Sequence, residues 1–358
     1  MSKGNVLVTG VTGFIATQVA LTFLDEGYSV RGSVRSADKG AEWIALFPQH
    51  KAKFEYVVVA DMTLAGAFND AVKGVDYIAH VASPAFWGQG DNEKDILLPA
   101  INGTKNLVEA TKIEPKIKRV VFTSSLAAVI NPALPADTLH TPDEWNPMTY
   151  EEAKNQTTPM FVYRASKALA EKTFWEYIEK EKPTWAGSVI APWYVKQFFV
   201  GALDMDLPMD SGCFGPPLQK ITSLAGLNVS VKYLWNMADG TFKNGVPAIG
   251  FPVCSDVRDV ALAHVRAVER DAAKNQRYLV IANHYNPDMA VEVIGRAHPE
   301  LKDNRLPPVD PVKIKQLIPF NVDTSKTQKD LGIVYTPFEK TIVDTVDYLL
   351  EVEKQLAK

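Results

Sequence analysis

The sequence predicts an α/β fold built on a doubly wound parallel sheet, followed by a smaller lobe that covers a substrate. Short apolar runs alternate with stretches of helical periodicity along the first half of the chain, as is typical of parallel strands joined by helices. A cluster of glycines directly follows the first run. Polar residues follow the later runs, at the edge where such sheets bind ligands.

The first strand and its turn lie within residues 6–16. Gly10 and Gly13 stand between this strand and a helix that carries Ile15 and Val19 on one face. Glycine allows a tight turn and a close approach of a ligand to the backbone, and the N–H groups that begin the helix favour a phosphate. The same glycines would also suit a turn that only packs a helix against a strand, so the motif alone leaves both interpretations open.

Four further strands are expected, each with polar residues at its end. Because the connections between parallel strands are right-handed crossovers, these strands should form one sheet of the Rossmann type, with a helix around residues 100–111. The expected strands are 28–36, 54–60, 77–82 and 119–123, and the polar residues at their ends are Arg35, Asp61, Ser83 and Ser125.

The composition changes near residue 190, where proline and glycine become frequent and the elements shorten. We therefore expect a dinucleotide-binding domain over residues 1–190 and mainly a substrate-binding lobe over residues 191–358. A helix that begins at Asp256 and a strand over 277–281 predict that the chain returns to the first domain within about residues 225–285.

Composition and charge argue against several classes of function. The chain has 358 residues, a net charge of −4 and no basic cluster, so no nucleic-acid partner is expected. Its two cysteines, Cys213 and Cys254, have no histidine at metal-ligand spacing, so no metal site is expected. No apolar run reaches the length of a membrane span and no signal peptide precedes the first strand, so we expect a cytoplasmic protein without membrane contact. His80 and His264 are expected to be structural.

A tyrosine and a lysine four residues apart predict acid–base chemistry. Tyr163 and Lys167 lie on one face of a predicted helix, so the ammonium can stabilise the phenolate and lower a pKa that is near 10 in free tyrosine. Tyr163 could then act as a general acid toward a carbonyl oxygen, and Ser125 could hydrogen-bond the same oxygen. A second copy of this spacing, Tyr150 and Lys154, stands in an acidic stretch and is expected to be the start of a surface helix, with Lys154 paired to Glu151 or solvent.

These motifs occur together in one known family. The chain resembles the extended short-chain dehydrogenases/reductases, and among them the fungal NADPH-dependent aldehyde and carbonyl reductases, which include the yeast methylglyoxal reductases and are related to plant dihydroflavonol reductase. The motifs that carry the resemblance span residues 5–265 and are Thr9-Gly10-x-x-Gly13-x-x-Ala16, Val81-Ala82-Ser83-Pro84, residues 95–104, Phe122-Thr123-Ser124-Ser125, Tyr163-x-x-x-Lys167 and residues 256–264.

The resemblance implies a role for particular residues of this chain. It implies a catalytic set of Ser125, Tyr163 and Lys167, with Tyr163 and Lys167 also binding the cofactor and Lys167 holding the nicotinamide ribose. It implies that Pro192 and Val195 flank the nicotinamide ring. The remaining residues implied to bind the cofactor are Gly10, Thr12, Gly13, Phe14 and Ile15 at the pyrophosphate, Asp61 and Met62 at the adenine, and Val81, Ala82 and Ser83.

The charges after the second strand favour NADPH over NADH. An arginine at this place accommodates a 2′-phosphate, whereas an acidic residue binds a free ribose hydroxyl. Arg35 and Lys39 offer two cations here, Ser33 or Ser36 offers a hydroxyl, and Asp38 is the only acid. A solvated basic turn is the alternative interpretation.

The expected substrate pocket includes Ser125 and is otherwise aromatic. Phe86 and Trp87 stand on a loop beyond a strand end, where binding residues are common. Trp193 is either a wall of this pocket or a core residue. It lies in the stretch 191–198, which departs from the family because a glycine and a proline that usually follow Val195 are replaced. Such a lining would suit apolar or aryl carbonyl compounds.

We therefore expect an NADPH-dependent reductase that converts an aldehyde or ketone to an alcohol, acting as a monomer or homodimer. A sugar-nucleotide epimerase or dehydratase of the same fold is the first alternative, and a non-catalytic NADPH-binding sensor is the second. The sequence leaves open the physiological substrate and the stereochemistry of the alcohol.

Overall fold

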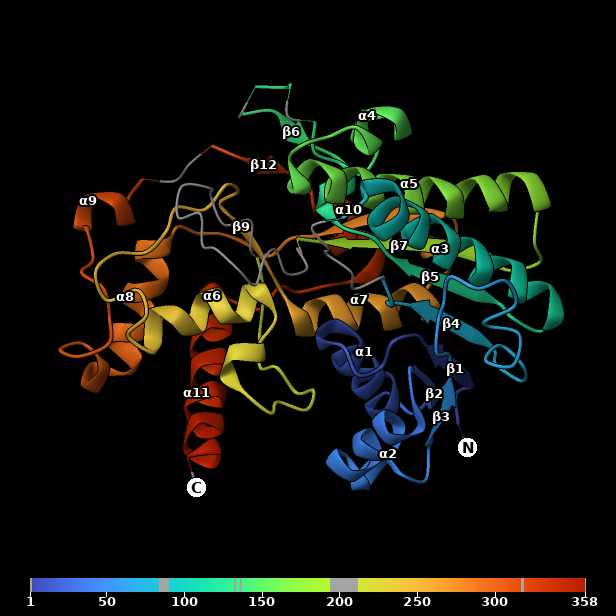
Figure 1. The fold of residues 1–358 in the computed structure, drawn as a ribbon, viewed down its shortest axis with the longest axis horizontal. Helices are drawn as coiled ribbons and strands as arrows, with labels where there is room; N and C mark the ends of the chain where they lie inside the picture. Colours follow the sequence, from blue (N-terminus) through green and yellow to red (C-terminus); the bar gives the residue numbers. More distant parts are fainter. Residues whose placement is uncertain are drawn as a thin grey trace.

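Seven strands form one parallel sheet in the order β10-β7-β5-β4-β1-β2-β3 (Figure 1). The order of the first five strands is that of a doubly wound Rossmann sheet, which confirms the predicted fold class. This computed structural model describes residues 2–83, 90–131, 133–135, 137–193, 212–316 and 319–357. The strands are β1 (Asn5–Val8), β2 (Ser29–Val34), β3 (Phe54–Val58), β4 (Tyr77–His80), β5 (Arg119–Thr123), β7 (Ala186–Pro192) and β10 (Gln276–Val280).

Helices cover both faces of this sheet. α1 (Phe14–Asp25) packs against α7 (Val257–Glu269) on one face, and α3 (Leu98–Ala110) packs against α5 (Pro159–Glu181) on the other. Figure 1 shows α3 and α5 above the sheet and α1 and α7 below it. α2 (Ala37–Leu46) lies against β2 and β3.

Burial on both faces explains why the strands are apolar throughout. Val6, Leu7 and Val8 of β1 are all fully buried. Because successive side chains of a strand point to opposite faces, Val6 and Val8 pack in the cluster that contains α1, whereas Leu7 packs in the cluster under α3 and α5.

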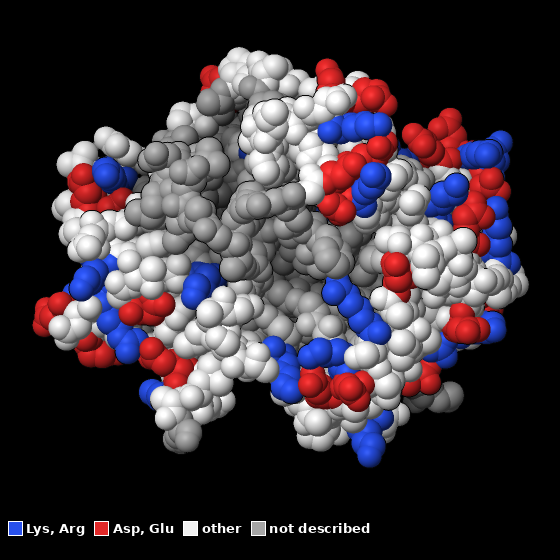
Figure 2. All heavy atoms as spheres, viewed as in Figure 1, with Lys and Arg blue, Asp and Glu red and all other residues white. Residues whose placement is uncertain are grey.

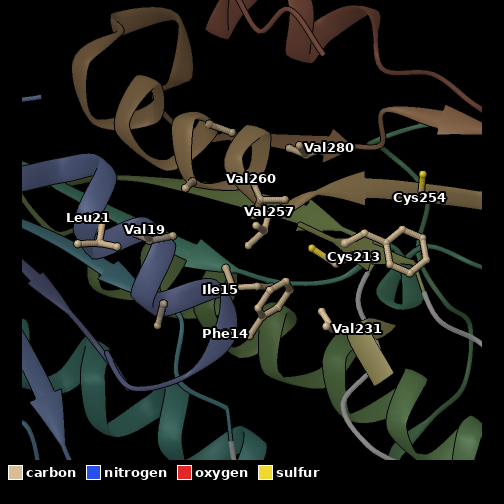
Figure 3. Packing of buried hydrophobic residues seen from close by; sticks show 14 of the residues in the cluster. Phe14, Ile15, Val19, Leu21, Cys213, Val231, Cys254, Val257, Val260 and Val280 are labelled. Carbon is tan, nitrogen blue, oxygen red and sulfur yellow. The ribbon is translucent and has the colours of Figure 1, made fainter. Parts of the chain in front are cut away.

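The C-terminal part of the chain shares a core with the sheet domain. Val19 of α1 faces Val257 and Val260 of α7, and the same cluster continues through Phe14 to Val231 (Figure 3). The large elements there are α6 (Val229–Ala238), α8 (Pro287–Ala297) and α11 (Phe338–Leu356). This shared core fixes the C-terminal segment beside the carboxyl ends of the strands.

Two small sheets and several short helices complete the fold. The sheets have the orders β11-β9-β8 and β12-β6. Their strands are β6 (Leu139–His140), β8 (Cys213–Phe214), β9 (Val253–Asp256), β11 (Asn283–His284) and β12 (Asn321–Val322). The short helices are η1 (Pro48–His50), η2 (Asn92–Leu97), η3 (Thr111–Ile113), η4 (Leu126–Ala128), α4 (Tyr150–Lys154), η5 (Leu224–Gly226), η6 (Asp271–Ala273), η7 (Pro299–Leu301), α9 (Pro311–Ile314) and α10 (Ser325–Leu331).

Some predicted bounds differ from the observed ones. The helix expected to open at Tyr163 begins at Pro159, because proline is favoured in the first turn, where its missing N–H is not needed. The strands expected to end at residues 36, 60 and 82 each end two residues earlier, where the chain turns over the sheet edge. No bounds were predicted for β7, which lies between β5 and β10.

Candidate active site

A cavity of about 950 Å³ opens at the carboxyl ends of the parallel strands. Its walls include the residues that directly follow β1, β2, β3, β4 and β5, as expected for a doubly wound sheet. Figure 2 shows this face of the molecule hollowed near its centre, with lysine and arginine side chains along the lower rim. The predicted cofactor-binding residues that line the cavity are Gly10, Thr12, Gly13, Phe14, Ile15, Arg35, Lys39, Asp61, Met62, Val81, Ala82, Ser83 and Lys167.

The glycine turn after β1 is held in a conformation that needs glycine. Gly10 has a φ of +65°, and a Cβ there would lie 3.1 Å from the Cβ of Ala82. The amide of Gly13 donates to the carbonyl of Gly10 at 2.9 Å, and the amide of Gly10 donates to Ser33 Oγ at 2.9 Å. Gly13 is the N-cap of α1, so the first N–H groups of this helix face the cavity without a side chain between them and a ligand. This arrangement suits a pyrophosphate.

The end of β1 is tied to the end of β4 by a buried threonine. Thr9 Oγ1 accepts hydrogen bonds from the amides of Val81 and Ala82 at 3.0 and 2.9 Å, and it lies 2.9 Å from Nδ1 of His80. Burial, with a smaller contribution from the charge of Lys167, lowers the pKa of His80 to about 3. His80 is therefore a neutral structural group that shapes the cavity wall.

His264 provides a test of how buried histidines set the acid stability of the protein. It lies 2.7 Å from Thr123 Oγ1, and burial lowers its pKa to about 4. As pH falls from 6.5 toward 4, the unfolded chain takes up a proton on this ring that the folded protein does not, so the free energy of unfolding falls. We expect His264→Gln to reduce this slope by up to about 1.4 kcal/mol per pH unit, measured by urea unfolding.

Asp259 has the opposite effect on the pH dependence of the free energy of unfolding, and it is unchanged between the original protein and His264→Gln. Burial raises its pKa to about 6, so this carboxyl stabilises the folded protein at low pH, and its contribution is lost as pH rises through 6. Because Asp259 is present in both proteins, its contribution cancels in the difference of slopes. Equal slopes for the original protein and His264→Gln would contradict the expected role of His264.

Two cations and a hydroxyl lie where the cavity meets the start of α2. Arg35, Ser36 and Lys39 are exposed and line the cavity. Ser33 is buried, and its Oγ accepts from Gly10, so Ser36 is the exposed hydroxyl of the two that the sequence offered. Ser36 is the N-cap of α2, and among the described residues its side chain makes no capping hydrogen bond. These groups suit a phosphate at the helix N-terminus.

The chain after β3 is positioned by α3. Asn106 Nδ2 donates to the carbonyl of Met62 at 3.0 Å, and a Cβ on Gly103 would lie 2.4 Å from the methyl of Met62. Asp61 accepts from the hydroxyl and the amide of Thr63 at 2.7 and 2.8 Å, and these hydrogen bonds, with a smaller contribution from Arg35, lower the pKa of Asp61. Asp61 is thus a fixed, ionised wall of the cavity.

The three predicted catalytic residues come from two neighbouring elements. Ser125 is the N-cap of η4, where its Oγ accepts from the amide of Ala127 at 3.2 Å. Tyr163 is 2% exposed and packs in one cluster with the first residues of η4. Lys167 Nζ lies 5.7 Å from the centre of the Tyr163 ring and donates to Ser83 Oγ at 3.1 Å. Lys167 therefore links the tyrosine to the loop after β4.

A buried ion pair that the sequence did not indicate supports this arrangement. Glu171, one turn beyond Lys167, is fully buried and accepts from Ser124 Oγ at 2.5 Å. Nε and Nη2 of Arg277 lie 2.6 and 3.0 Å from the two oxygens of Glu171, and the guanidinium stacks on Trp145 with a separation of 4.1 Å. The ion pair joins α5, the loop after β5 and the edge strand β10.

Four predicted site residues that the structure describes do not line the cavity, namely Ser125, Tyr163, Pro192 and Trp193. Pro192 ends β7 and is buried. Trp193 is fully buried, packs at an angle of 62° against Phe251 and donates its amide to Ser255 Oγ, so in the described part of the chain its surroundings are core. Val195, Phe86 and Trp87 fall outside the described residues, and their assignments stay predictions.

The second tyrosine–lysine pair lies in the short helix α4, away from the cavity. The hydroxyl of Tyr150 donates to Glu93 at 2.7 Å, and Lys154 pairs with the same carboxylate at 2.9 Å. The expectation that Lys154 pairs with Glu151 or solvent is therefore wrong, because η2 brings Glu93 alongside α4.

One wall of the cavity was not predicted. Residues of the stretch 219–228 form a further part of the wall, and they include Lys220 and Asn228. The stretch stands before α6 in the C-terminal part, where the sequence shows only a proline-rich region, so no local motif marks it. Within the described ranges, no group of three potential metal-ligating side chains occurs. In the same ranges, no helix is both long and apolar enough to cross a membrane.

Comparison with known proteins agrees with the motifs and the fold. Residues 7–177 match the model of the 3-beta hydroxysteroid dehydrogenase/isomerase family. The chain is 38% identical to an uncharacterised oxidoreductase of Schizosaccharomyces pombe, over 98% of both chains, and 35% identical to the ketoreductase azaE of Aspergillus niger, over 97% of both. It belongs to the extended short-chain dehydrogenase/reductase family.

A solved structure of this family shows the same architecture. The crystal structure of yeast methylglyoxal/isovaleraldehyde reductase Gre2 complexed with NADPH is 29% identical to this short-chain dehydrogenase/reductase, covers 98% of this chain and 99% of its own, and superposes with a TM-score of 0.85. The likeness therefore extends over the sheet domain and the C-terminal part alike.

Proposed function

We propose that this protein reduces an aldehyde or ketone to the alcohol with NADPH. The observation that carries the proposal is that Lys167 lines the cavity and lies beside Tyr163, which packs against η4, the short helix that Ser125 caps, while other parts of the same wall suit a pyrophosphate and an additional phosphate. The roles of Ser125, Tyr163 and Lys167 in the reaction are part of this proposal. The similarity to a ketoreductase and to an NADPH-bound aldehyde reductase supports the class of reaction.

Tyr163 is the proposed proton donor to the carbonyl oxygen. Its burial excludes bulk water, and the nearby charge of Lys167 stabilises the phenolate that forms when the proton leaves. Ser125 is proposed to donate a hydrogen bond to the same oxygen and so to stabilise the negative charge that develops there. Lys167 is also proposed to orient the nicotinamide ribose.

The walls of the cavity fit NADPH by their donor chemistry. The first turn of α1 would hold the pyrophosphate, Asp61 and Met62 would border the adenine, and Arg35, Ser36 and Lys39 would bind the 2′-phosphate. Val81, Ala82 and Ser83 would line the central part, and Pro192 and Val195 would flank the nicotinamide. When bound, NADPH supplies the hydride for the carbonyl carbon. Phe86 and Trp87 are proposed to border the substrate, which we place among small carbonyl compounds.

Replacing Arg35 with alanine tests the cofactor assignment. Because Arg35 would contact a phosphate that NADH lacks, we expect Arg35→Ala to weaken NADPH binding by about 10-fold, which is the lower end for a hydrogen bond to a charged group. The affinity for NADH should stay the same. Titrations that follow cofactor fluorescence measure both values. An equal loss for the two cofactors would contradict a role at the 2′-phosphate.

The reaction class is tested by loss of reduced-nicotinamide absorbance with a panel of aliphatic aldehydes, dicarbonyls, aryl ketones and β-keto esters. We expect turnover with NADPH on some members of the panel and slower turnover with NADH. If no compound of the panel is reduced although NADPH binds, the assignment as a carbonyl reductase would be contradicted. A nicotinamide cofactor that co-purifies with the protein would then favour the epimerase or dehydratase class instead.

A further inference from the structure

The stretch that forms the unpredicted wall carries a lysine that reaches across to α2. Nζ of Lys220 lies 2.8 Å from Oε1 of Glu42, and Nζ of Lys39 lies 2.9 Å from Oε2 of the same carboxylate. Two ammonium groups bound to one carboxylate are necessarily close together. Lys220 is therefore a neighbour of Lys39 in space, although 178 residues separate it from Glu42 along the chain.

The balance of charge at this end of the cavity is positive. Arg35, Lys39 and Lys220 all line the cavity, and Glu42 is the carboxylate that the two lysines share. Asp61 is a second carboxylate of this wall and lies within the field of Arg35, so the three cations with Glu42 and Asp61 leave a net charge of +1. A phosphate monoester carries a charge of about −1.5 to −2 near neutral pH. The cluster therefore keeps a net positive charge, which favours a phosphate monoester over a neutral hydroxyl.

The N-terminus of α2 adds hydrogen-bond donors beside these cations. Ser36 is the N-cap of α2, a helix of ten residues, and its exposed hydroxyl and the first amides of the helix face the same part of the cavity as Arg35 and Lys39. An anion placed there receives hydrogen bonds from the helix N-terminus and lies within the field of all three cations. Lysine and arginine side chains gather at this rim of the hollow (Figure 2).

We propose that Lys220, in the stretch 219–228, is a specificity-determining residue that binds the 2′-phosphate of NADPH together with the residues at the start of α2. This inference rests on the proposed function, because it takes NADPH as the cofactor. On binding, the phosphate replaces Glu42 as the partner of Lys220, so the C-terminal part of the chain takes part in choosing between the two cofactors. Recognition of the phosphate is then shared between two walls that are distant in sequence.

The test measures the dissociation constants of NADPH and NADH for Lys220→Met and for Lys220→Arg. We expect Lys220→Met to weaken NADPH binding by about 5-fold, as for a largely exposed ionic contact, and to leave NADH binding unchanged. Lys220→Arg should keep the NADPH affinity because it keeps the charge. Lys354→Met is the matched control, since Lys354 is an exposed lysine that pairs with Glu351 at 2.7 Å.

A double variant separates direct contact from an indirect effect of Glu42. Removing Lys220 also frees a negative charge that would repel the phosphate. We therefore compare Glu42→Gln with the double variant Glu42→Gln/Lys220→Met. A further loss of NADPH affinity in the double variant supports direct contact, whereas equal affinities would overturn it.

The adenosine end can be probed without the reaction. Adenosine 2′,5′-bisphosphate and AMP differ only in the 2′-phosphate, and their competition with the bound reduced cofactor gives the preference for that group directly. Lys220→Met should reduce this preference, and an unchanged preference would overturn the inference. If the original protein shows no preference for the bisphosphate, the proposed choice of NADPH fails as well, so the two failures are distinguishable.

Discussion

Tyr163→Phe will lower kcat by about 10²- to 10⁴-fold, the usual contribution of a positioned general acid. Phenylalanine keeps the buried ring that packs against η4, so the fold and the NADPH affinity should stay close to those of the original protein. The expected loss therefore falls on the chemical step alone. Steady-state rates of NADPH oxidation and a fluorescence titration with NADPH measure the two quantities separately.

The chain contains its own control for this substitution. Tyr150 has the same spacing to a lysine, but its hydroxyl donates to Glu93, and its lysine partner Lys154 does not line the cavity, whereas Lys167 does. Tyr150→Phe should leave kcat nearly unchanged. Near-normal turnover by Tyr163→Phe, or an equal loss in both variants, would contradict the assignment of Tyr163 as the proton donor.

Arg277→Met should have the largest effect on stability. Arg277 is 8% exposed and is the ionic partner of Glu171, which is fully buried. Its removal leaves a buried carboxylate without a countercharge, and breaking such a pair costs about 3–5 kcal/mol. We expect a loss of this size in the free energy of unfolding, measured by urea denaturation.

Arg296→Met is the comparison for this measurement. Arg296 pairs with Glu339 at 3.3 Å, but both side chains are more than half exposed, so the loss should be within about 1 kcal/mol. If the two variants lose similar free energy, the Glu171–Arg277 pair does not have the structural importance that its burial suggests.

The sheet was predictable because its determinants are local. A strand that is buried on both faces reads as a continuous apolar run, as in Val6, Leu7 and Val8. The turn at Gly10 requires a positive φ, for which glycine is the usual residue. Asp61 and Ser83 stand three residues beyond the ends of β3 and β4 and line the cavity, and their roles toward a cofactor stay predictions.

The features that were missed depend on contacts between distant parts of the chain. Glu171 and Arg277 meet only because β10 pairs with β7 at the edge of the sheet, and neither residue belongs to a recognisable motif. Lys220 reaches Glu42 only because the C-terminal part shares a core with α1. A lysine near a proline-rich stretch, such as Lys220, is expected to be exposed to solvent. That Glu42 is its partner follows only from the assembled fold.

Transfer of deuterium from the cofactor tests the central claim most directly. NADPH with two deuterium atoms at C4 of the nicotinamide would be incubated with the protein and a small aldehyde or ketone of the panel, and the alcohol would be analysed by mass spectrometry. We expect one deuterium on the carbinol carbon of the product, and at least about 100-fold less labelled alcohol when Tyr163→Phe replaces the original protein for the same time. An alcohol without deuterium, or NADPH that binds but is not consumed by any carbonyl compound, would contradict reduction by hydride transfer at this site.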